Sequence, residues 1–325
     1  MKKPTKAQKR GGKKVYKVRN WKEYNEALVN RGRITFWVSE DALKQWQEQT
    51  KTGKRGKPKF FSNIAIETAL TLREIFHLPL RQTEGLLGSI LEKMGALVKA
   101  PDYSTLSLRC ETLPVVVRVR VLDGQSIHAV LDSTGIKVYG EGEWKVRKHG
   151  WSKHRTWRKL HLGLDEAKND ILLGEVTGND VADCEMFKPL LDQLPDTTNI
   201  AQVSADGAYD KRICYDELER RGVPLITIPP QKNARIRQHG NTSDNPLPRD
   251  ETLRRIRAVG RARWKQESGY HRRSLAETAM SRLKTIFSDK VRSRLLPRQR
   301  VELLLRCRIL NRMTLLGMPD SYVVA

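Results

Sequence analysis

The spacing of apolar residues changes along the chain and predicts different elements in different segments. Between residues 60 and 110 the apolar positions recur at helical spacing. Breaks at Pro79 and Gly95 divide this segment into two predicted helices, and a third is predicted to begin near residues 102–104. Upstream, the alternating stretch ITFWVS (34–39) is typical of a strand. The first third of the chain is therefore predicted to be mainly helical.

From about residue 123 the pattern becomes that of a sheet. Three apolar runs are joined by short polar turns such as DEAKND (165–170), which favour hairpins. The expected elements are, in order, strands over SIHAVLDSTGIKVYG, TWRKLHLGLD and DILLGEVTG, a helix over ADCEMFKPLLDQL, a strand over IAQVSAD, a helix over 210–221 and a strand over VPLITI. This order predicts a mixed α/β fold, specifically a ribonuclease-H-like mixed sheet flanked by helices.

Composition sets the remaining boundaries. The expected domains are a basic N-terminal arm and linker (1–59), a helical domain (60–120) and the ribonuclease-H-like domain (121–325). Within the last, the periodic pattern disappears after Pro229 and Pro230, and residues 231–265 are predicted to be a basic loop or insertion. Two helices, over about 270–288 and 297–316, are expected to close the chain.

The charge of the chain indicates a polyanionic partner. Lys and Arg number 61 against 37 Asp and Glu, a formal net charge of +24. Such a surplus favours nucleic acid, although RNA or an anionic membrane surface would also fit. The helices of residues 60–120 fit either a helix-turn-helix unit that reads DNA or a plain supporting bundle. No run approaches ~18 uncharged apolar residues, so no membrane span is expected. The four cysteines lie far apart, which argues against a zinc module and suits a reducing cytoplasm.

Two acidic residues each end an apolar run within a predicted strand. Asp132 ends the apolar run HAVL, and Asp206 ends the run VSA before two small residues. A carboxylate at the end of a strand is well placed to project toward a cation. Strand-end Asp residues also cap turns, and that alternative fits each of these two residues equally well.

The predicted helix over 270–288 presents a charged face. At about 100° per residue, Tyr270, Arg273, Glu277 and Lys284 fall within about 60° of one another, and the apolar residues lie on the opposite side. A structural pairing of Arg273 with Glu277 at i,i+4 would also give a polar face. The combination of an acid, two cations and a phenol nonetheless suits phosphoryl transfer.

These residues carry a resemblance to a known family. Tyr270-x2-Arg273-x3-Glu277-x6-Lys284, inside SGYHRRSLAETAMSRLK, resembles the Y-R-E-K signature of bacterial insertion-sequence transposases of the DDE class. LDSTG and ADGAYD resemble the segments that carry the first and second catalytic Asp of that family. RKLHLGLD and the tail LNRMTLLGMP are similar to members of the insertion-sequence-five type. The resemblance spans about residues 20–320.

The resemblance implies both an activity and a set of site residues. It implies that Asp132, Asp206 and Glu277 hold two Mg²⁺ ions, for which Mn²⁺ can substitute, and catalyse cleavage and strand transfer. Tyr270, Arg273 and Lys284 would bind the transposon end. The implied partners are double-stranded DNA, as terminal inverted repeats and as target, and a second copy of the chain in a synaptic homodimer. The implied location is the bacterial cytoplasm, at the nucleoid.

Two other functions fit the same residues. A nuclease on this fold would cut DNA without joining it, and a basic DNA-binding repressor would use the carboxylates only structurally. Of the other polar residues, His161 is expected to be a satisfied strand histidine and Asp183 to cap the start of a helix.

Overall fold

The computed structural model describes most of the chain. It covers residues 15–49, 58–117, 125–138, 157–239 and 246–324. The basic arm predicted before residue 15 and most of the predicted linker lie outside these ranges. Segments 118–124, 139–156 and 240–245 lie outside them as well.

In the part of the chain that the structure describes, six helices precede the central sheet. They are α1 (Trp21–Arg31), α2 (Ile34–Trp37), α3 (Glu40–Lys44), α4 (Asn63–Ile75), α5 (Leu80–Lys93) and α6 (Tyr103–Thr112). The strand predicted over residues 34–39 is wrong, because this stretch begins with the single turn α2, in which Val38 donates to the carbonyl of Ile34 at 2.9 Å. Tertiary packing decides the matter: Trp37 is buried, and the Arg312 guanidinium lies 4.9 Å from its ring centroid.

The central sheet is mixed, as the sequence predicts. The strands are β2 (Ile127–Val138), β3 (Trp157–Asp165), β4 (Ile171–Gly178), β5 (Ile200–Ser204), β6 (Leu225–Thr227) and β7 (Lys290–Val291). Their order is β4-β3-β2-β5-β6, with β7 paired to the end of β2. The pairs β2–β3 and β3–β4 are antiparallel, whereas β2–β5 and β5–β6 are parallel. The chain is therefore a mixed α/β protein.

Alternation along β2 sends side chains into two separate cores. Val130 and Ile136 join the core that also contains α12 (Ser274–Phe287), α13 (Leu296–Leu316) and the N-terminal helices. Ala129 and Leu131 point into the other core, with α8 (Phe187–Leu191) and α9 (Arg212–Arg220). The sheet is thus covered by helices on both faces.

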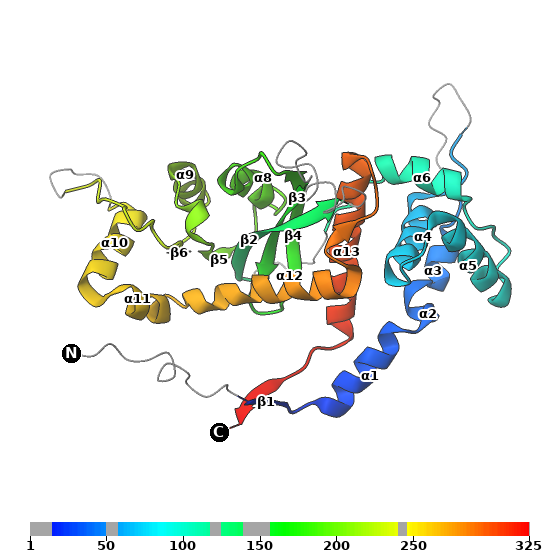
Figure 1. Cartoon of the computed structure of the whole chain (residues 1–325), viewed down its shortest axis with the longest axis horizontal. Helices are drawn as coiled ribbons and strands as arrows, with labels where there is room; N and C mark the ends of the chain where they lie inside the picture. Colours follow the sequence, from blue (N-terminus) through cyan, green and yellow to red (C-terminus); the bar gives the residue numbers. More distant parts are fainter. Residues whose placement is uncertain (1–14, 50–57, 118–124, 139–156, 240–245, 325) are drawn as a thin grey trace, which may run out of the picture.

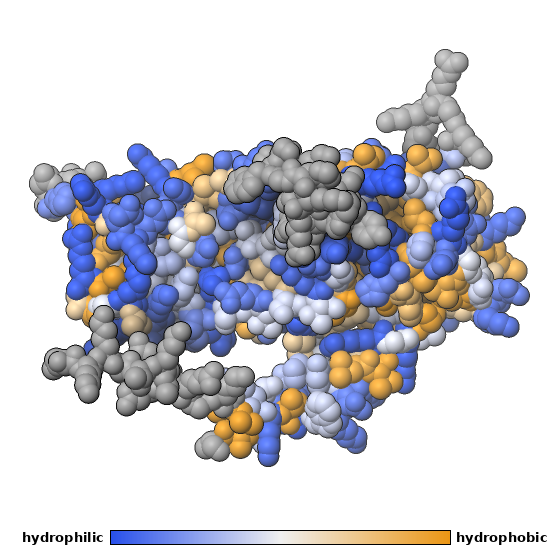
Figure 2. All heavy atoms as spheres, in the orientation of Figure 1, coloured by the Kyte–Doolittle hydropathy of each residue, from blue (hydrophilic) through white to orange (hydrophobic). Residues whose placement is uncertain are grey.

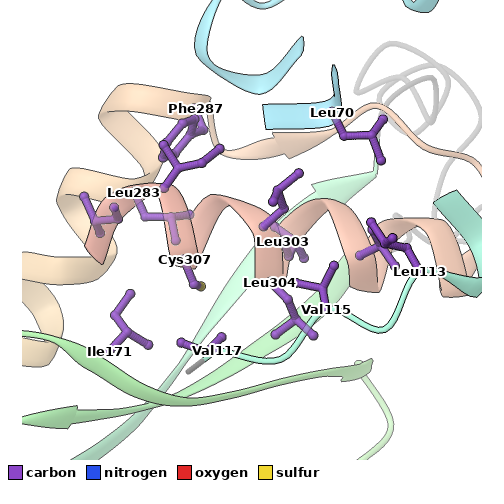
Figure 3. Packing of buried hydrophobic residues seen from close by; sticks show 14 of the residues in the cluster. Leu70, Leu113, Val115, Val117, Ile171, Leu283, Phe287, Leu303, Leu304 and Cys307 are labelled. Atoms are coloured by element: carbon purple, nitrogen blue, oxygen red, sulfur yellow. The ribbon is translucent and has the colours of Figure 1, made fainter. Parts of the chain in front are cut away.

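The first of these cores is continuous from the N-terminal helices to the end of the chain. Figure 3 shows Leu303, Leu304 and Cys307 of α13 between the sheet residue Ile171 and Leu70 of α4. A single buried cluster of this kind couples the elements that contribute to it. The N-terminal helices and the sheet therefore share one core.

The C-terminal half of the predicted basic loop is in fact helical. It contains α10 (Pro248–Val259) and α11 (Arg261–Glu267), at the opposite end of the molecule from α4–α6 (Figure 1). Asp250 is fully buried, and its carboxylate accepts the backbone N–H groups of Arg237 and Gln238, both at 2.8 Å. Only Leu253 and Trp264 of the two helices supply buried apolar side chains, so the apolar periodicity is too sparse to predict them. Figure 2 shows this end mostly hydrophilic.

The two ends of the described chain pair with each other. Strand β1 (Val15–Val18) runs antiparallel to β8 (Ser321–Val324) in a separate two-stranded sheet below the body of the molecule (Figure 1). Among the residues that the structure describes, no helix is both long and apolar enough to cross a lipid bilayer.

Candidate active site

The register of two parallel strands brings two acidic residues to one edge of the sheet. Val130 of β2 lies opposite Ser204 of β5. Two residues further along, Asp132 lies within β2 and Asp206 lies just beyond the end of β5, so the two residues are at the same level. This edge is the carboxyl end of β5, where open α/β sheets commonly bind ligands.

Each of these carboxylates also makes a local hydrogen bond. Asp132 Oδ1 accepts the N–H of Ser133 at 2.9 Å. Asp206 Oδ1 accepts the N–H of Ala208 at 2.9 Å and caps the 3-10 turn η4 (Gly207–Tyr209). The turn-capping alternative is therefore correct for Asp206, but it uses only one carboxylate oxygen.

Arg273 connects the sheet edge with the charged helix. It ends the 3-10 turn η5 (Tyr270–Arg273), and α12 begins at the next residue. Its Nη1 donates to Asp132 Oδ2 at 2.6 Å, and its Nη2 donates to Glu277 Oε1. The predicted stripe is therefore not one regular helix, yet it faces β2. One guanidinium bridges two carboxylates that are far apart in the sequence.

The pKa of Asp132 reports how much negative charge collects here. Burial is the main cause that raises this pKa, and the nearby charges of Asp206 and Glu277 raise it further. The Ser133 N–H and the charge of Arg273 lower it but do not compensate fully. Three acidic residues therefore influence one another electrostatically at this edge.

The carboxylates are not arranged as a complete metal-binding site. In the described ranges, no three His, Cys, Asp or Glu side chains lie close enough together to hold a metal ion as they are. Asp132 and Glu277 are instead joined through Arg273. The oxygen donors suit a hard divalent cation, and a positive group already lies between two of them.

A pocket of about 540 Å³ opens beside these acidic residues. It is lined by Asp132, Ser133, Thr134, Glu277, Met280, Ser281, Lys284 and Thr285. Lys284 Nζ donates to Thr134 Oγ1 at 2.6 Å, which holds the ammonium group against β2. The pocket therefore has an acidic end and a basic end along α12. Sequence reasoning missed Thr134, although it lies within the LDSTG segment.

Two cations lie close to the ring of Tyr270. The guanidinium carbon of Arg273 is 5.8 Å from its ring centroid, and Lys265 Nζ is 4.9 Å from it. The ring of Trp264, itself buried, lies 6.0 Å away. Burial raises the pKa of Tyr270, and Asp206 and Asp132 act in the same direction. Trp264 and Lys265 fall within the predicted insertion, so the sequence offers no signal for their role beside Tyr270.

Hydrogen bonds from the sheet hold the turn that carries Arg273. Gln202 of β5 donates to the carbonyl of Ser268 at 3.2 Å. Arg272 forms an ion pair with Glu166 in the turn between β3 and β4. Both contacts lie just before or within η5, so the sheet determines where Arg273 lies.

A second polar cluster occupies the other face of the sheet. His161 is fully buried, and its Nε2 lies 2.9 Å from Thr177 Oγ1, but its Nδ1 has no hydrogen-bond partner among the described residues, so the expectation of a satisfied strand histidine holds for one ring nitrogen only. The prediction that Asp183 caps a helix is wrong, because its side chain instead accepts Lys159 Nζ at 3.2 Å and lies 3.8 Å from His161 Nδ1. Burial lowers the pKa of His161, although Asp183 opposes this.

Comparisons with known proteins identify the chain's relatives. Two family models, both described as "Transposase DDE domain", match residues 29–141 and 123–312, and the second match alone covers more than half of the chain. Among solved structures, the chain is similar to the piggyBac transposase in the cryo-EM structure of its synaptic complex with hairpin DNA. The identity is 10% and the TM-score 0.37, over 88% of this chain and 73% of that chain. At this level the structural match supports no conclusion about the present chain.

Proposed function

The chain belongs to the DDE transposase family and is a DNA transposase, and from this premise we propose that Asp132, Asp206 and Glu277 are its catalytic carboxylates. One observation carries the assignment of Asp132 and Glu277: a single guanidinium bonds to both. The parallel register of β2 and β5 places Asp206 at the same level as Asp132. This placement supports Asp206 as the third catalytic carboxylate.

The donor set fits divalent cations. Carboxylate oxygens are the ligands that Mg²⁺ and Mn²⁺ prefer, and Arg273 demonstrates that Asp132 and Glu277 can share one positive group. We therefore propose that the three carboxylates hold two Mg²⁺ ions, with Mn²⁺ as a substitute. When bound, such ions activate the attacking oxygen and stabilise the charge that develops on the scissile phosphate.

The chain's own residues bind and orient the DNA. Lys284, held by Thr134 at the basic end of the pocket, provides a fixed positive charge for a backbone phosphate. Arg273 and the phenol of Tyr270 lie at the acidic end. Tyr270 lies beside these cations and is hydrogen-bonded to Arg273, and together with Arg273 it contacts the transposon end. The substrates we propose are the terminal inverted repeats and a target duplex.

We propose that the chain contains a helical domain followed by a catalytic domain. The strand order supports a ribonuclease-H-like catalytic domain over residues 121–325, which includes the basic insertion over 231–265. For residues 60–120, the core shared by α4, α12 and α13 favours a supporting bundle over an independent helix-turn-helix unit. Joining two ends further implies a homodimer in the synaptic complex, acting at the bacterial nucleoid.

The test is a charge-removing substitution at Glu277. Glu277→Gln is expected to abolish cleavage of a duplex carrying the inverted repeats that flank the gene, while the affinity for that duplex stays nearly unchanged. Glu185→Gln, an exposed carboxylate on the 3-10 turn before α8, is the matched control and should keep full cleavage. Equal loss of binding and cleavage in Glu277→Gln would contradict a metal-binding role.

A second assay separates the related functions. A duplex with a pre-cut end is offered together with target DNA, and joined product is measured. A transposase yields the joined product, whereas a nuclease of the same fold cuts but does not join. A repressor would bind the repeats and produce no nick in Mg²⁺ or Mn²⁺.

A further inference from the structure

We infer that Arg273 is a positioning residue that holds Asp132 and Glu277 together before metal binds. A divalent cation then replaces Arg273 at the two carboxylates, and the guanidinium binds a DNA phosphate instead. Metal binding and DNA binding therefore depend on each other. The inference rests on the proposed function of the carboxylates. It adds a role for Arg273 in the state that precedes DNA binding.

The contacts of Arg273 are specific. Its two terminal nitrogens bond to one oxygen of each carboxylate, Asp132 Oδ2 and Glu277 Oε1. The guanidinium is planar, and its donors point in fixed directions, so this fork determines the separation of the two acids. The Arg273 side chain is only 19% exposed, and that of Asp132 13%, so water screens the pair poorly.

The electrostatics show why such a group is needed. Without a positive partner, the charges of Asp206 and Glu277 would act on Asp132 unopposed and raise its pKa further. Burial by itself would lower the pKa of Arg273, but Asp132, Tyr270 and Glu277 together raise it. The guanidinium is thus held firmly in its charged form at the acidic end of the pocket.

The same contacts create a competition. A divalent cation that binds Asp132 and Glu277 needs the oxygens that Arg273 now occupies. Arg273 can leave them at low cost only if another anion is close, and under the proposed function the anion that reaches the pocket beside Asp132 is a DNA phosphate. DNA should therefore raise the metal affinity, and by linkage the metal should raise the DNA affinity by the same factor.

The experiment measures Mn²⁺ affinity of the full chain by titration calorimetry, with and without a pre-cut terminal-repeat duplex, after subtraction of Mn²⁺ bound by the duplex alone. For the unmodified chain, DNA is expected to raise the affinity about 5- to 100-fold, the usual range of coupling. Arg273→Gln should bind Mn²⁺ without DNA nearly as tightly as the unmodified chain does with DNA, and should lose most of the coupling.

Three further variants make the result decisive. Arg273→Lys keeps the charge but not the fork, and should retain part of the coupling even if Arg273→Gln folds poorly. Arg212→Gln, at an exposed arginine of α9, should leave both affinities unchanged. Asp132→Asn should lose Mn²⁺ binding in both conditions.

The outcomes separate the inference from the proposed function. If Arg273→Gln and the unmodified chain bind Mn²⁺ alike while Asp132→Asn does not, the inference is overturned and the metal site stands. If Asp132→Asn binds Mn²⁺ as the unmodified chain does, the proposed metal site itself is wrong. Weaker Mn²⁺ binding in Arg273→Gln without DNA would show that Arg273 only supports the site and does not compete for it.

Discussion

Arg306 and Arg273 each bridge two carboxylates, in very different surroundings. Arg306 donates to Glu74 at 2.8 Å and to Glu302 at 2.6 Å, and all three side chains are at most 2% exposed. Arg273 makes the same pair of contacts, but Glu277 is 58% exposed and the site opens into a pocket of about 540 Å³. The chemistry is the same, and solvent access differs.

This difference in solvent access distinguishes the structural ion pairs of Arg306 from those of Arg273, which a ligand can replace. Glu74 belongs to α4, whereas Arg306 and Glu302 belong to α13. This buried cluster of three side chains therefore links the N-terminal helices to the helix that packs on the central sheet. Glu302 also accepts the N–H groups of Arg292 and Ser293, at 2.8 and 2.9 Å, just after β7. A ligand cannot reach the buried Arg306 cluster, whereas it can reach the contacts of Arg273 from the pocket.

The largest expected effect is on stability. Arg306→Met leaves two buried carboxylates without their main positive partner and should cost roughly 3–5 kcal/mol of the free energy of unfolding. Arg273→Met, the matched change at the open site, should cost less than about 1–2 kcal/mol, because water can solvate Glu277, which is 58% exposed. Urea denaturation measures both. Equal losses would mean that solvent access does not distinguish the two sites.

A smaller effect is expected at the basic end of the pocket. Thr134→Val removes the acceptor that holds Lys284 and should weaken DNA binding by about 0.5–1.5 kcal/mol, whereas Thr134→Ser keeps the hydroxyl and should bind normally. Lys284→Gln should in addition lower the salt dependence of DNA binding by about one phosphate contact. Fluorescence anisotropy over a salt series measures both quantities. Equal weakening in Thr134→Ser would exclude a role for the hydroxyl.

The smallest effect is a gain in stability at Asp132. Burial raises the pKa of this carboxyl, so its ionised form destabilises the folded chain as the pH rises through that pKa. Asp132→Asn should therefore unfold at slightly higher urea than the unmodified chain at pH 7. The difference should shrink as the pH falls below the ordinary pKa of Asp, about 3.9, because both chains are then uncharged at this position. A constant difference across this pH range would contradict the linkage.

The sequence and the structure agree where the pattern is long and regular. The strands β2, β3 and β4 and the helices α4, α5, α12 and α13 carry enough apolar residues to be recognised from spacing alone. Short or highly charged elements escape this kind of recognition. Residues 34–37 alternate like a strand yet form a helical turn around the buried Trp37, and α10 and α11 bury too few apolar residues to show a period.

The residue types of the candidate site could be predicted, but its contacts could not. Strand-end acids and a helix with Arg273, Glu277 and Lys284 on one face are visible in one dimension, and the family match confirms the transposase prediction that rests on them. The catalytic roles of these residues remain predictions. Thr134, Trp264 and Lys265 became candidates only through their neighbours in space.

The sequence by itself determined the order of the long strands and helices, the basic character of the chain and the chemistry that its acidic residues can perform, because these depend on local spacing and side-chain type. Only the tertiary structure decided that Asp132 meets an arginine 141 positions away, and that this arginine also bonds to Glu277. That meeting depends on the register of β2 with β5 and on the packing of α12 over the sheet. Both arise from contacts between distant segments, which a one-dimensional pattern does not contain.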